Sequence, residues 1–365
     1  MMKKFVCLLA ALLLLTSCAL AEEYVTLAEL REQAKAGWDQ TYTAKGREVV
    51  VNVELDQFPD VDACPLLTVE SITIDEKDPR MDKWKEREHC EIYNYSDRIG
   101  VYVRNSRAHR LIDNYRGKTL QDEAVYNHGE VPDHDAEDCD VTYEEFLSMF
   151  LSDVNELTGV SPEEISIDEV WVKGPVYKAK KSGDQLVRGD KIIATGCYHV
   201  FAHQLMHGIP VLGANQAIDK GYFSYHYYQP QYRYFTFFAV RETAVKKDDL
   251  PLLSFDAFKG KLEKLIDTGK LRGVDAMRFG YGTCKDGNEW KLIPVWMVTC
   301  GYTSDPSKEN VMPYIDKDGD NVIPETYKEY YFNAQTGELM ERYEVNRYEE
   351  SLRMPKKILT WDDVN

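Results

Sequence analysis

The sequence predicts an α+β protein in which antiparallel sheets are each covered by a helix, and three observations lead to this fold class. Two segments have the 3.6-residue apolar spacing of amphipathic helices, and both begin with a hydroxyl residue followed by an aromatic one, at Thr142 and Ser254. Strand-like sequence follows each segment, over residues 165–172 and 274–281. Apolar residues alternate with polar ones along residues 48–56, as in a half-buried strand. Because an apolar helix face has to be covered, we expect a repeated helix-plus-sheet unit.

The first eighteen residues have the features of an export signal. Lys3 and Lys4 precede an apolar run that is too short for a permanent membrane span, and Leu15-Thr16-Ser17-Cys18 follows it. Leu-Thr-Ser-Cys resembles the lipobox of bacterial lipoproteins, whose cysteine receives diacylglycerol and becomes the mature N-terminus. Residues 1–18 are therefore expected to be a lipoprotein signal peptide, with Cys18 as the lipid attachment site on the extracytoplasmic side of the cell membrane. The alternative is ordinary secretion, because Ala19-Leu20-Ala21 also fits a cleavage site.

The region after the signal, residues 22–126, is expected to combine a helix with strands. Thr26 and Glu29 predict a capping box at the start of a short helix, and Gly37 ends it. Strands are predicted over residues 48–56, 67–74 and 98–103. The glycine, proline and acids of residues 127–140 predict a linker and a domain boundary.

Two helix-plus-sheet units are expected after this linker, over residues 141–250 and 251–365. Their helices are predicted to run from Thr142 to Gly159 and from Ser254 to Gly269. In the second unit a strongly apolar strand is expected within residues 290–302. A hairpin turn is expected over residues 333–337, because glycine permits a positive φ there and the polar residues cap themselves.

Several C-terminal segments carry a family resemblance. Gly280-Tyr281, Pro294-Val295-Trp296-Met297-Val298 and Phe332-Asn333-Ala334-Gln335-Thr336-Gly337-Glu338 resemble the pattern of PepSY-like domains and of the YycH/YycI type of extracytoplasmic regulators. Gly208-Ile209-Pro210 is similar to a segment that precedes this pattern. The resemblance covers about the last 130 residues. It implies a PepSY-like, cystatin-like repeat in the C-terminal part and no catalytic residue. The mature chain also resembles uncharacterised Gram-positive lipoproteins that contain a domain of unknown function, through residues 42–47 and 59–62.

Charge and cysteine content limit the classes of partner. The formal net charge is −18, and loss of the two signal-peptide lysines makes the mature chain −20. Nucleic acid is therefore an unsuitable partner, and an anionic bilayer repels the body of the protein, so contact with the membrane is expected through the lipid anchor alone. Six cysteines lie beyond the signal, and their spacing allows either disulfides or buried unpaired thiols. They are Cys64, Cys90, Cys139, Cys197, Cys284 and Cys300.

Three histidines spaced four residues apart, His199, His203 and His207, are the clearest candidate for metal chemistry. On a helix they would share a face, and His203 to His207 would be similar to the zinc protease motif H-E-x-x-H. Gln204 stands where the catalytic glutamate would be, so water activation is not expected. We favour the other interpretation, a β-strand over residues 198–211 whose histidines line one face, and we assign no metal ligand.

Residues 316–321 place carboxylates at positions 1, 3 and 5 of a loop similar to the calcium-binding loop of an EF-hand. Asn321 occupies the position of the glycine and Tyr327 that of the bidentate glutamate, so a solvated hairpin turn is expected instead. The acids around His134 favour a solvated linker over a metal site in the same way. These acids are Asp133, Asp135, Glu137, Asp138 and Asp140.

The aromatic-rich segment Tyr222 to Phe238 supports a different class of function. Exposed rings of this kind stack on sugars, whereas buried ones belong to a packed strand. The alternation of Tyr232, Tyr234 and Phe238 favours a packed sheet. Solvent exposure of these rings therefore decides between carbohydrate binding and a core role.

Together these observations predict a lipid-anchored, extracytoplasmic protein that binds or regulates an envelope protein or peptide. We expect no catalytic residue and no cofactor, because the chain contains no nucleophile elbow, phosphate-binding loop or dinucleotide fingerprint. The alternatives are a carbohydrate-binding or substrate-capturing lipoprotein and a zinc-dependent hydrolase.

Overall fold

The computed structural model of the chain divides it into two compact units, each assembled from segments far apart in the sequence. The first unit contains residues 1–66, 247–279 and 294–340, and the second contains residues 67–246, 280–293 and 341–365. The units therefore do not coincide with consecutive sequence segments, and residues 127–140 connect two elements of the second unit. The structure describes residues 24–55, 57–72, 77–82, 90–94, 101–105, 119–120, 123–182, 185–212, 223–229, 232–237, 239–286, 289–302, 314–315, 321–322 and 328–340.

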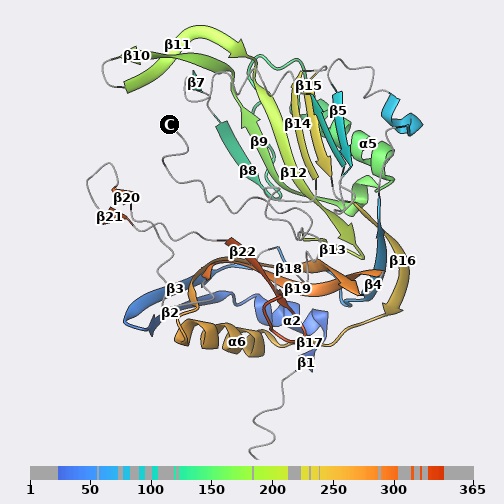
Figure 1. The fold of residues 1–365 in the computed structure, drawn as a ribbon, viewed down its shortest axis with the longest axis vertical. Coiled ribbons are helices and arrows are strands. Elements are labelled where there is room, and N and C mark those ends of the chain that lie inside the picture. The colour runs from blue at the N-terminus through green and yellow to red at the C-terminus, as the bar shows by residue number, and fades with distance from the viewer. Residues whose placement is uncertain are drawn as a thin grey trace, which may run out of the picture. The chain divides into compact units, whose positions relative to one another are not determined.

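The protein is mostly β, with several sheets, so the predicted α+β class with a helix over each sheet was wrong. The described residues contain three α-helices and two 3-10 turns, and strands make up the rest of their regular structure. The largest sheet has eight strands and bends into a half-barrel (Figure 1). A helix is about 10 Å wide and strands lie about 4.8 Å apart, so one helix covers only about two strands of such a sheet. The predicted apolar faces of the helices are buried, but most strands of this sheet have no helix packed on them.

The first unit is built on strands that pair both in sequence order and across long separations. β2 pairs with β3 in an antiparallel hairpin, and β3 also pairs with β18 in parallel, at Val51 and Val274. β19 pairs with β22 along six residue pairs, from Val295↔Asn333 to Cys300↔Lys328. β18 and β19 form a long hairpin whose tip, residues 280–293, belongs to the second unit. The strands with described residues in the first unit are β1 (Tyr24–Val25), β2 (Trp38–Ala44), β3 (Arg47–Val53), β17 (Leu252–Leu253), β18 (Leu271–Asp286), β19 (Glu289–Tyr302), β20 (Tyr314–Ile315), β21 (Asn321–Val322) and β22 (Lys328–Asn333).

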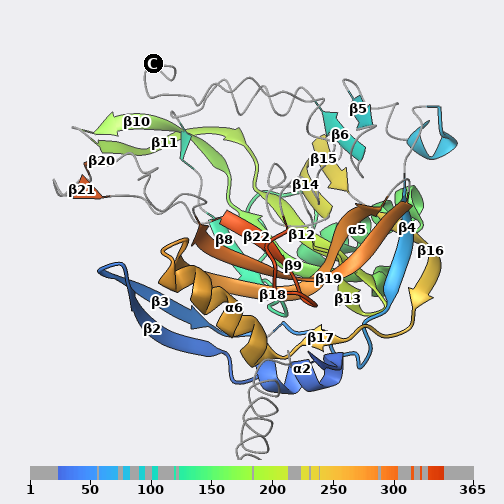
Figure 2. The same cartoon turned by 60° about the horizontal axis from the view of Figure 1, so that its bottom comes forward.

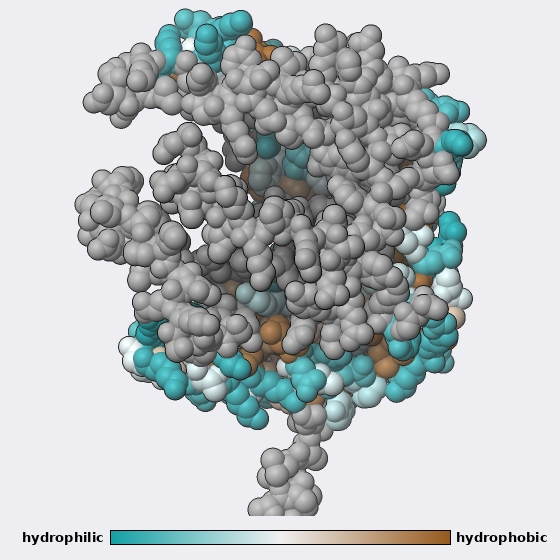
Figure 3. Space-filling model, viewed as in Figure 1, coloured by the Kyte–Doolittle hydropathy of each residue, from teal (hydrophilic) through white to brown (hydrophobic). Residues whose placement is uncertain are grey.

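The core of the first unit lies between these strands and helix α6, Phe255–Asp267. Trp296 of β19 is fully buried, and its ring stacks on Phe258 of α6 with the centroids 5.3 Å apart. Figure 2 shows α6 beside the β2–β3 hairpin, where the Tyr42 hydroxyl donates to Glu263 at 2.7 Å. On the face seen in Figure 3, hydrophilic residues cover much of the described surface of this unit, with apolar ones interspersed.

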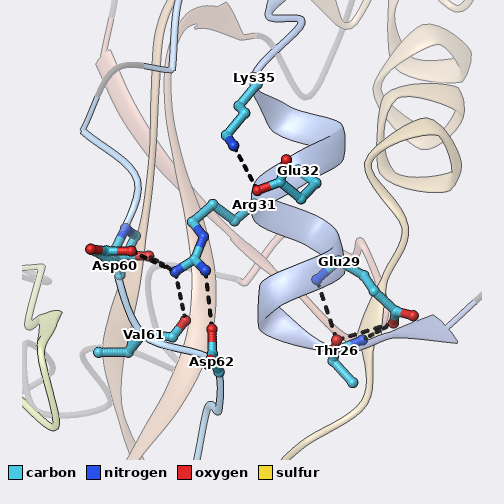
Figure 4. Close-up of polar contacts among 9 residues, drawn as sticks. Thr26, Glu29, Arg31, Glu32, Lys35, Asp60, Val61 and Asp62 are labelled. Carbon is cyan, nitrogen blue, oxygen red and sulfur yellow. Dashed lines mark hydrogen bonds and ion pairs between the residues drawn. The ribbon is translucent and has the colours of Figure 1, made fainter.

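Helix α2, Leu27–Ala34, begins at the predicted capping box. The Glu29 amide donates to the Thr26 hydroxyl, and the Thr26 amide donates to the Glu29 carboxylate at 2.8 Å. The Thr26 amide and the Thr26 hydroxyl both donate to the Glu29 carboxylate, and these two bonds lower the pKa of that carboxyl group. Arg31 on the same helix holds the following loop, because its guanidinium donates to the carboxylates of Asp60 and Asp62, both at 3.0 Å (Figure 4).

The half-barrel sheet belongs to the second unit, and its strand order is β5-β6-β15-β14-β12-β9-β8, with β13 paired to β12. Helix α5, Tyr143–Thr158, covers its central strands. Phe146 of the helix stacks on Tyr198 of β12 at 5.0 Å between centroids, and Phe150 packs on Tyr225 of β14 at 5.7 Å. The strands of this sheet are β5 (Cys90–Asn94), β6 (Val101–Asn105), β8 (Glu123–Asn127), β9 (Ile165–Lys173), β12 (Cys197–Met206), β13 (Ile209–Pro210), β14 (Phe223–Gln229) and β15 (Tyr232–Phe237).

Smaller elements complete the second unit. A hairpin of β10 and β11 pairs with β7, and β4 lies beside β16 and the hairpin tip of β19. The unit also contains two 3-10 turns, η1 (Pro79–Met81) and η2 (Pro162–Glu164), of which η2 leads directly into β9. The remaining strands are β4 (Leu66–Ser71), β7 (Thr119–Leu120), β10 (Val176–Ser182), β11 (Gln185–Ala194) and β16 (Val240–Lys247).

Local signals of the sequence are confirmed. The helix predicted from Thr142 is α5, with a complete capping box and Gly159 in the left-handed conformation at its end. The alternating valines form β3, and Val49, Val51 and Val53 are buried. In the predicted turn after β22, the Asn333 side chain accepts bonds from two following amides, and Gly337 has a φ of +67°.

Of the six cysteines beyond the signal, Cys139 and Cys300 are free thiols in the structure. Burial raises the pKa of the Cys300 thiol to about 12, so it stays protonated and unreactive at neutral pH. The side chain of Cys90 and the proposed lipid attachment site, Cys18, lie outside the described residues. A search of the described helices finds none with the length and apolar character needed to cross a membrane.

Candidate functional site

Strand β12 brings the candidate histidines into the half-barrel sheet, as the strand interpretation predicted. His199 and His203 are both buried, on the face of the sheet opposite α5. Tyr198 and Val200 alternate with them and are buried on the helix side, as the contact of Tyr198 with α5 shows. His207 follows the strand in a tight turn and has a φ of +53°. The helical arrangement required by a zinc protease motif is therefore absent.

His199 is held as a neutral imidazole within a cluster of rings. Its Nε2 lies 2.9 Å from the Ser224 hydroxyl of β14, and its ring stacks on His226 with the centroids 3.2 Å apart. Trp171 of β9 lies on its other side at 5.8 Å. Burial lowers the pKa of His199 well below its ordinary value, and electrostatic repulsion from His226 and Lys173 acts in the same direction. A serine next to a neutral histidine has the elements of a nucleophile and a base, but no carboxylate among the described residues orients this imidazole.

His203 has a different partner, the carboxylate of Asp168, with which its Nδ1 makes a very short buried contact. A bulge in β9 places Asp168 there, because Phe201 opposes Glu169 while the next residue of β12 opposes Ile167. Glu169 accepts a hydrogen bond from the Trp171 indole at 2.9 Å. The Asp168 carboxylate contacts His203, whereas the Ser224 hydroxyl contacts His199, so the cluster is not a Ser-His-Asp triad.

Gln204, which replaces the glutamate of the zinc protease motif, has a structural role. Its side-chain amide donates to the carbonyl oxygen of Val240 and its oxygen accepts from the Val240 amide, both at 2.9 Å. His207 points elsewhere, and its Nε2 lies 2.6 Å from the Glu242 carboxylate. Within the described residues, no group of three or more His, Cys, Asp or Glu side chains is placed to hold a metal ion.

The aromatic segment is part of the core wherever its side chains are described. Phe223, Tyr225, Tyr227 and Phe235 are at most 1% exposed, and the Tyr225 hydroxyl donates to buried Asp153 of α5 at 2.7 Å. These four rings cannot stack on a sugar. The other aromatic side chains of the segment lie outside those that the structure describes: Tyr222, Tyr228, Tyr232, Tyr234, Phe237 and Phe238.

The acids around His134 lie in the loop between β8 and α5 and serve that loop. The Asp133 carboxylate accepts from the Tyr126 hydroxyl of β8 at 2.5 Å and contacts His134, and both interactions lower the pKa of Asp133. Asp135 accepts from the first amide of α5, at Tyr143, and from the Tyr198 hydroxyl. The predicted turn at residues 316–321 falls between β20 and β21, which pair antiparallel. Residues 316–320 themselves lie outside the described residues.

The sequence interpretation missed most members of the cluster around His199. Trp171, Ser224 and His226 reach it from neighbouring strands, and Asp168 reaches His203 through the bulge. Period-two alternation along β9 and β14 predicts which of these residues share a face, but it does not predict that the two strands flank β12. A bulge has no marker in this sequence, which has neither glycine nor proline at that point.

No protein family model and no curated protein sequence matches the chain. Among solved structures, the chain is similar to the crystal structure of an uncharacterized protein from Eubacterium rectale ATCC 33656. The match has 13% sequence identity and a TM-score of 0.47, and it covers 86% of this chain and 97% of that one. Similarity at this level establishes neither a shared fold nor a shared function.

Proposed function

We propose that this protein is a lipid-anchored, extracytoplasmic binding protein that recognises an envelope protein or peptide without catalysing a reaction on it. The anchor rests on the export signal that ends at Leu15-Thr16-Ser17-Cys18. The binding role rests on the contacts of the candidate histidines in the second unit and on the exposed edge strand β8. The sequence resemblance of the C-terminal segments to PepSY-like domains and YycH/YycI-type regulators motivates the binding role, because modules of that type are used for inhibition and signalling.

The observation that carries the proposal is that the three candidate histidines are each engaged by a side chain of the same unit, while β8 has no strand on its outer edge among the described strands. His203 is paired with Asp168, His207 with Glu242, and His199 with Ser224. By contrast β8 is the last of the described strands of the half-barrel sheet, and Val125 at its centre is 44% exposed. An open strand edge is a surface for adding a polypeptide strand.

The anchor is tested by substitution of cysteines within the signal. Cells that express the full chain are labelled with a fatty acid analogue, and the Cys18→Ser variant is compared with Cys7→Ser. Cys7 lies inside the apolar run and serves as a matched control. We expect the label on the wild type and on the Cys7 variant, and its loss from the Cys18 variant together with release from the membrane fraction. A labelled Cys18→Ser protein would refute the anchor, and secretion of an unlabelled wild-type chain would favour cleavage after Ala21.

The binding role is tested with the anchored protein in its own membrane. Zero-length crosslinking followed by purification should recover one defined envelope protein or peptide with the wild type. The same experiment with the secreted, unlipidated chain is the control for local concentration. Recovery of no partner above background from membranes that contain the lipidated protein would count against the proposal.

A further inference from the structure

We infer that the outer edge of β8 binds an extended, basic polypeptide segment, which adds a strand to the half-barrel sheet. This inference rests on the proposed function and names the surface and the chemistry of its partner. It follows from three features of the second unit: the direction of the backbone groups of β8, the side chains on its two faces, and the charge of the surrounding chain.

The hydrogen bonds of Asn127 fix the direction of the backbone groups. Its amide donates to the Glu130 carboxylate at 2.6 Å, and its carbonyl oxygen accepts from the Glu130 amide at 2.9 Å. Both groups therefore point away from β9. Backbone groups of an antiparallel strand alternate in direction every residue, so those of Val125, two residues earlier, also point outward. No described residue bonds to the Val125 backbone on that side.

The two faces of this edge differ in chemistry. Val125 is opposite Trp171 of β9, on the histidine side of the sheet, and its exposure offers an apolar contact. Tyr126 points to the other face, where its hydroxyl binds Asp133 of the acidic loop. Asp133 is 81% exposed at its side chain, so the carboxylate remains accessible next to the edge. A strand added here would alternate apolar residues near Val125 with residues that face carboxylates.

The charge of the surrounding chain selects a basic partner. From Thr119 to Val172 the sequence contains sixteen aspartates and glutamates and not one lysine or arginine. This stretch includes β8, the acidic loop and α5, which all lie in the second unit. Asp153 and Asp168 of this stretch are buried, and Lys173 of β9 lies opposite Glu123 of β8, so the edge is predominantly rather than uniformly negative. Such a surface attracts a cationic segment over about 8 Å at physiological ionic strength, the Debye length. A second copy of this chain would bring the same negative charges to the edge, so pairing of β8 with itself is disfavoured.

Two peptides of six residues distinguish the inferred ligand from its alternatives, since β8 has five residues. One alternates Lys with Val, and the other alternates Glu with Val; both carry a fluorophore and are titrated into the mature protein while anisotropy is measured. We expect the Lys peptide to bind at least about tenfold more tightly than the Glu peptide, the equivalent of about one charge-assisted hydrogen bond. Affinity should fall as salt rises from about 0.01 M to about 0.15 M, because the Debye length shortens from about 30 Å to about 8 Å.

Backbone pairing is tested on the peptide and on the protein. N-methylation of alternate peptide amides should abolish binding in one register and spare it in the other, and this test does not depend on folding of a variant. On the protein, Val125→Pro removes the outward amide, and Val125→Thr is its control because it keeps both the amide and the β-branched shape. We expect a loss of about tenfold or more for the proline variant and a change of less than about threefold for threonine. Circular dichroism of the proline variant tests whether it is folded.

Several results would overturn the inference. They are equal binding of the Lys and Glu peptides, no effect of N-methylation in either register, and concentration-dependent self-association that is abolished by Val125→Pro. If crosslinking in membranes recovers a partner whose binding does not change in Val125→Pro, the proposed function stands and this edge is not its site. Failure to recover any partner refutes the proposed function itself, whatever the peptides do.

Discussion

Gln204 offers the sharpest test of the second unit, because its side chain replaces a piece of strand pairing. It is 2% exposed, and its amide group makes two hydrogen bonds of 2.9 Å to the backbone of Val240, which is 1% exposed. Gln204→Met keeps the side-chain volume and removes both bonds. The Val240 amide and carbonyl are then buried without a partner, and each costs about 1 to 3 kcal/mol.

We therefore expect the Gln204→Met variant to lose about 2 to 6 kcal/mol of unfolding free energy. For a unit of this size, each kcal/mol lowers the melting temperature by about 2 to 4 °C. The measurement is urea and thermal unfolding followed by tryptophan fluorescence. Gln40→Met is the matched control, because the Gln40 side chain is exposed and, among the described residues, only accepts a bond from the Tyr42 hydroxyl. A loss below about 1 kcal/mol for Gln204→Met, or an equal loss in both variants, would refute the reasoning.

The Gln204→Glu variant tests how the free energy of unfolding depends on pH. An ionised carboxylate at position 204 still accepts from the Val240 amide, but it is buried and faces the Val240 carbonyl oxygen. The folded state therefore favours the protonated carboxyl group, which raises the pKa of this introduced group. A group with a raised folded pKa stabilises the protein below its unfolded pKa, about 4.3, and that stability is lost as pH rises through the folded pKa. Gln204→Glu should thus approach wild-type stability only in acid. A stability difference from the wild type that is independent of pH would contradict this account.

Three further predictions concern other parts of the fold. Because the pKa of His199 is lowered in the folded state, the unfolded chain binds more protons than the folded one below about pH 6.5. The free energy of unfolding should therefore fall, as pH decreases through this range, by up to about 1.4 kcal/mol per pH unit. In urea unfolding, His199→Gln should flatten this fall, whereas His134→Gln, at an exposed histidine, should not. Thr142→Ala removes the capping box of α5 and should cost about 1 kcal/mol, whereas Thr142→Ser should cost little, and equal losses would argue against a capping role. Trp296→Ala should cost about 3 to 5 kcal/mol, because the ring is fully buried against Phe258 and Phe279. Trp296→Phe should cost clearly less, since it also removes a buried indole N–H that has no partner in the described part of the chain. Thermal melting that ranks the two variants in the opposite order would refute this.

The candidate site was predictable from the sequence only in part. The strand interpretation of His199 and His203 was correct, because aromatic and β-branched neighbours with period-two spacing favour a strand over a helix. Their partners were not predictable. Asp168 lies 35 residues from His203 and Val240 lies 36 residues from Gln204, and sequence spacing carries no information on which strands become neighbours.

The sequence by itself determined the local elements of this protein, whereas only the tertiary structure decided how they combine. Capping boxes at Thr26 and Thr142, the alternating valines of β3 and the turn at Asn333 depend on bonds between residues a few positions apart, and such bonds form wherever the chain goes. The mostly β class depends instead on pairing between distant strands, such as β3 with β18. Periodicity tells which side of a strand is buried, but not which segment covers it, because many apolar surfaces can satisfy the same face.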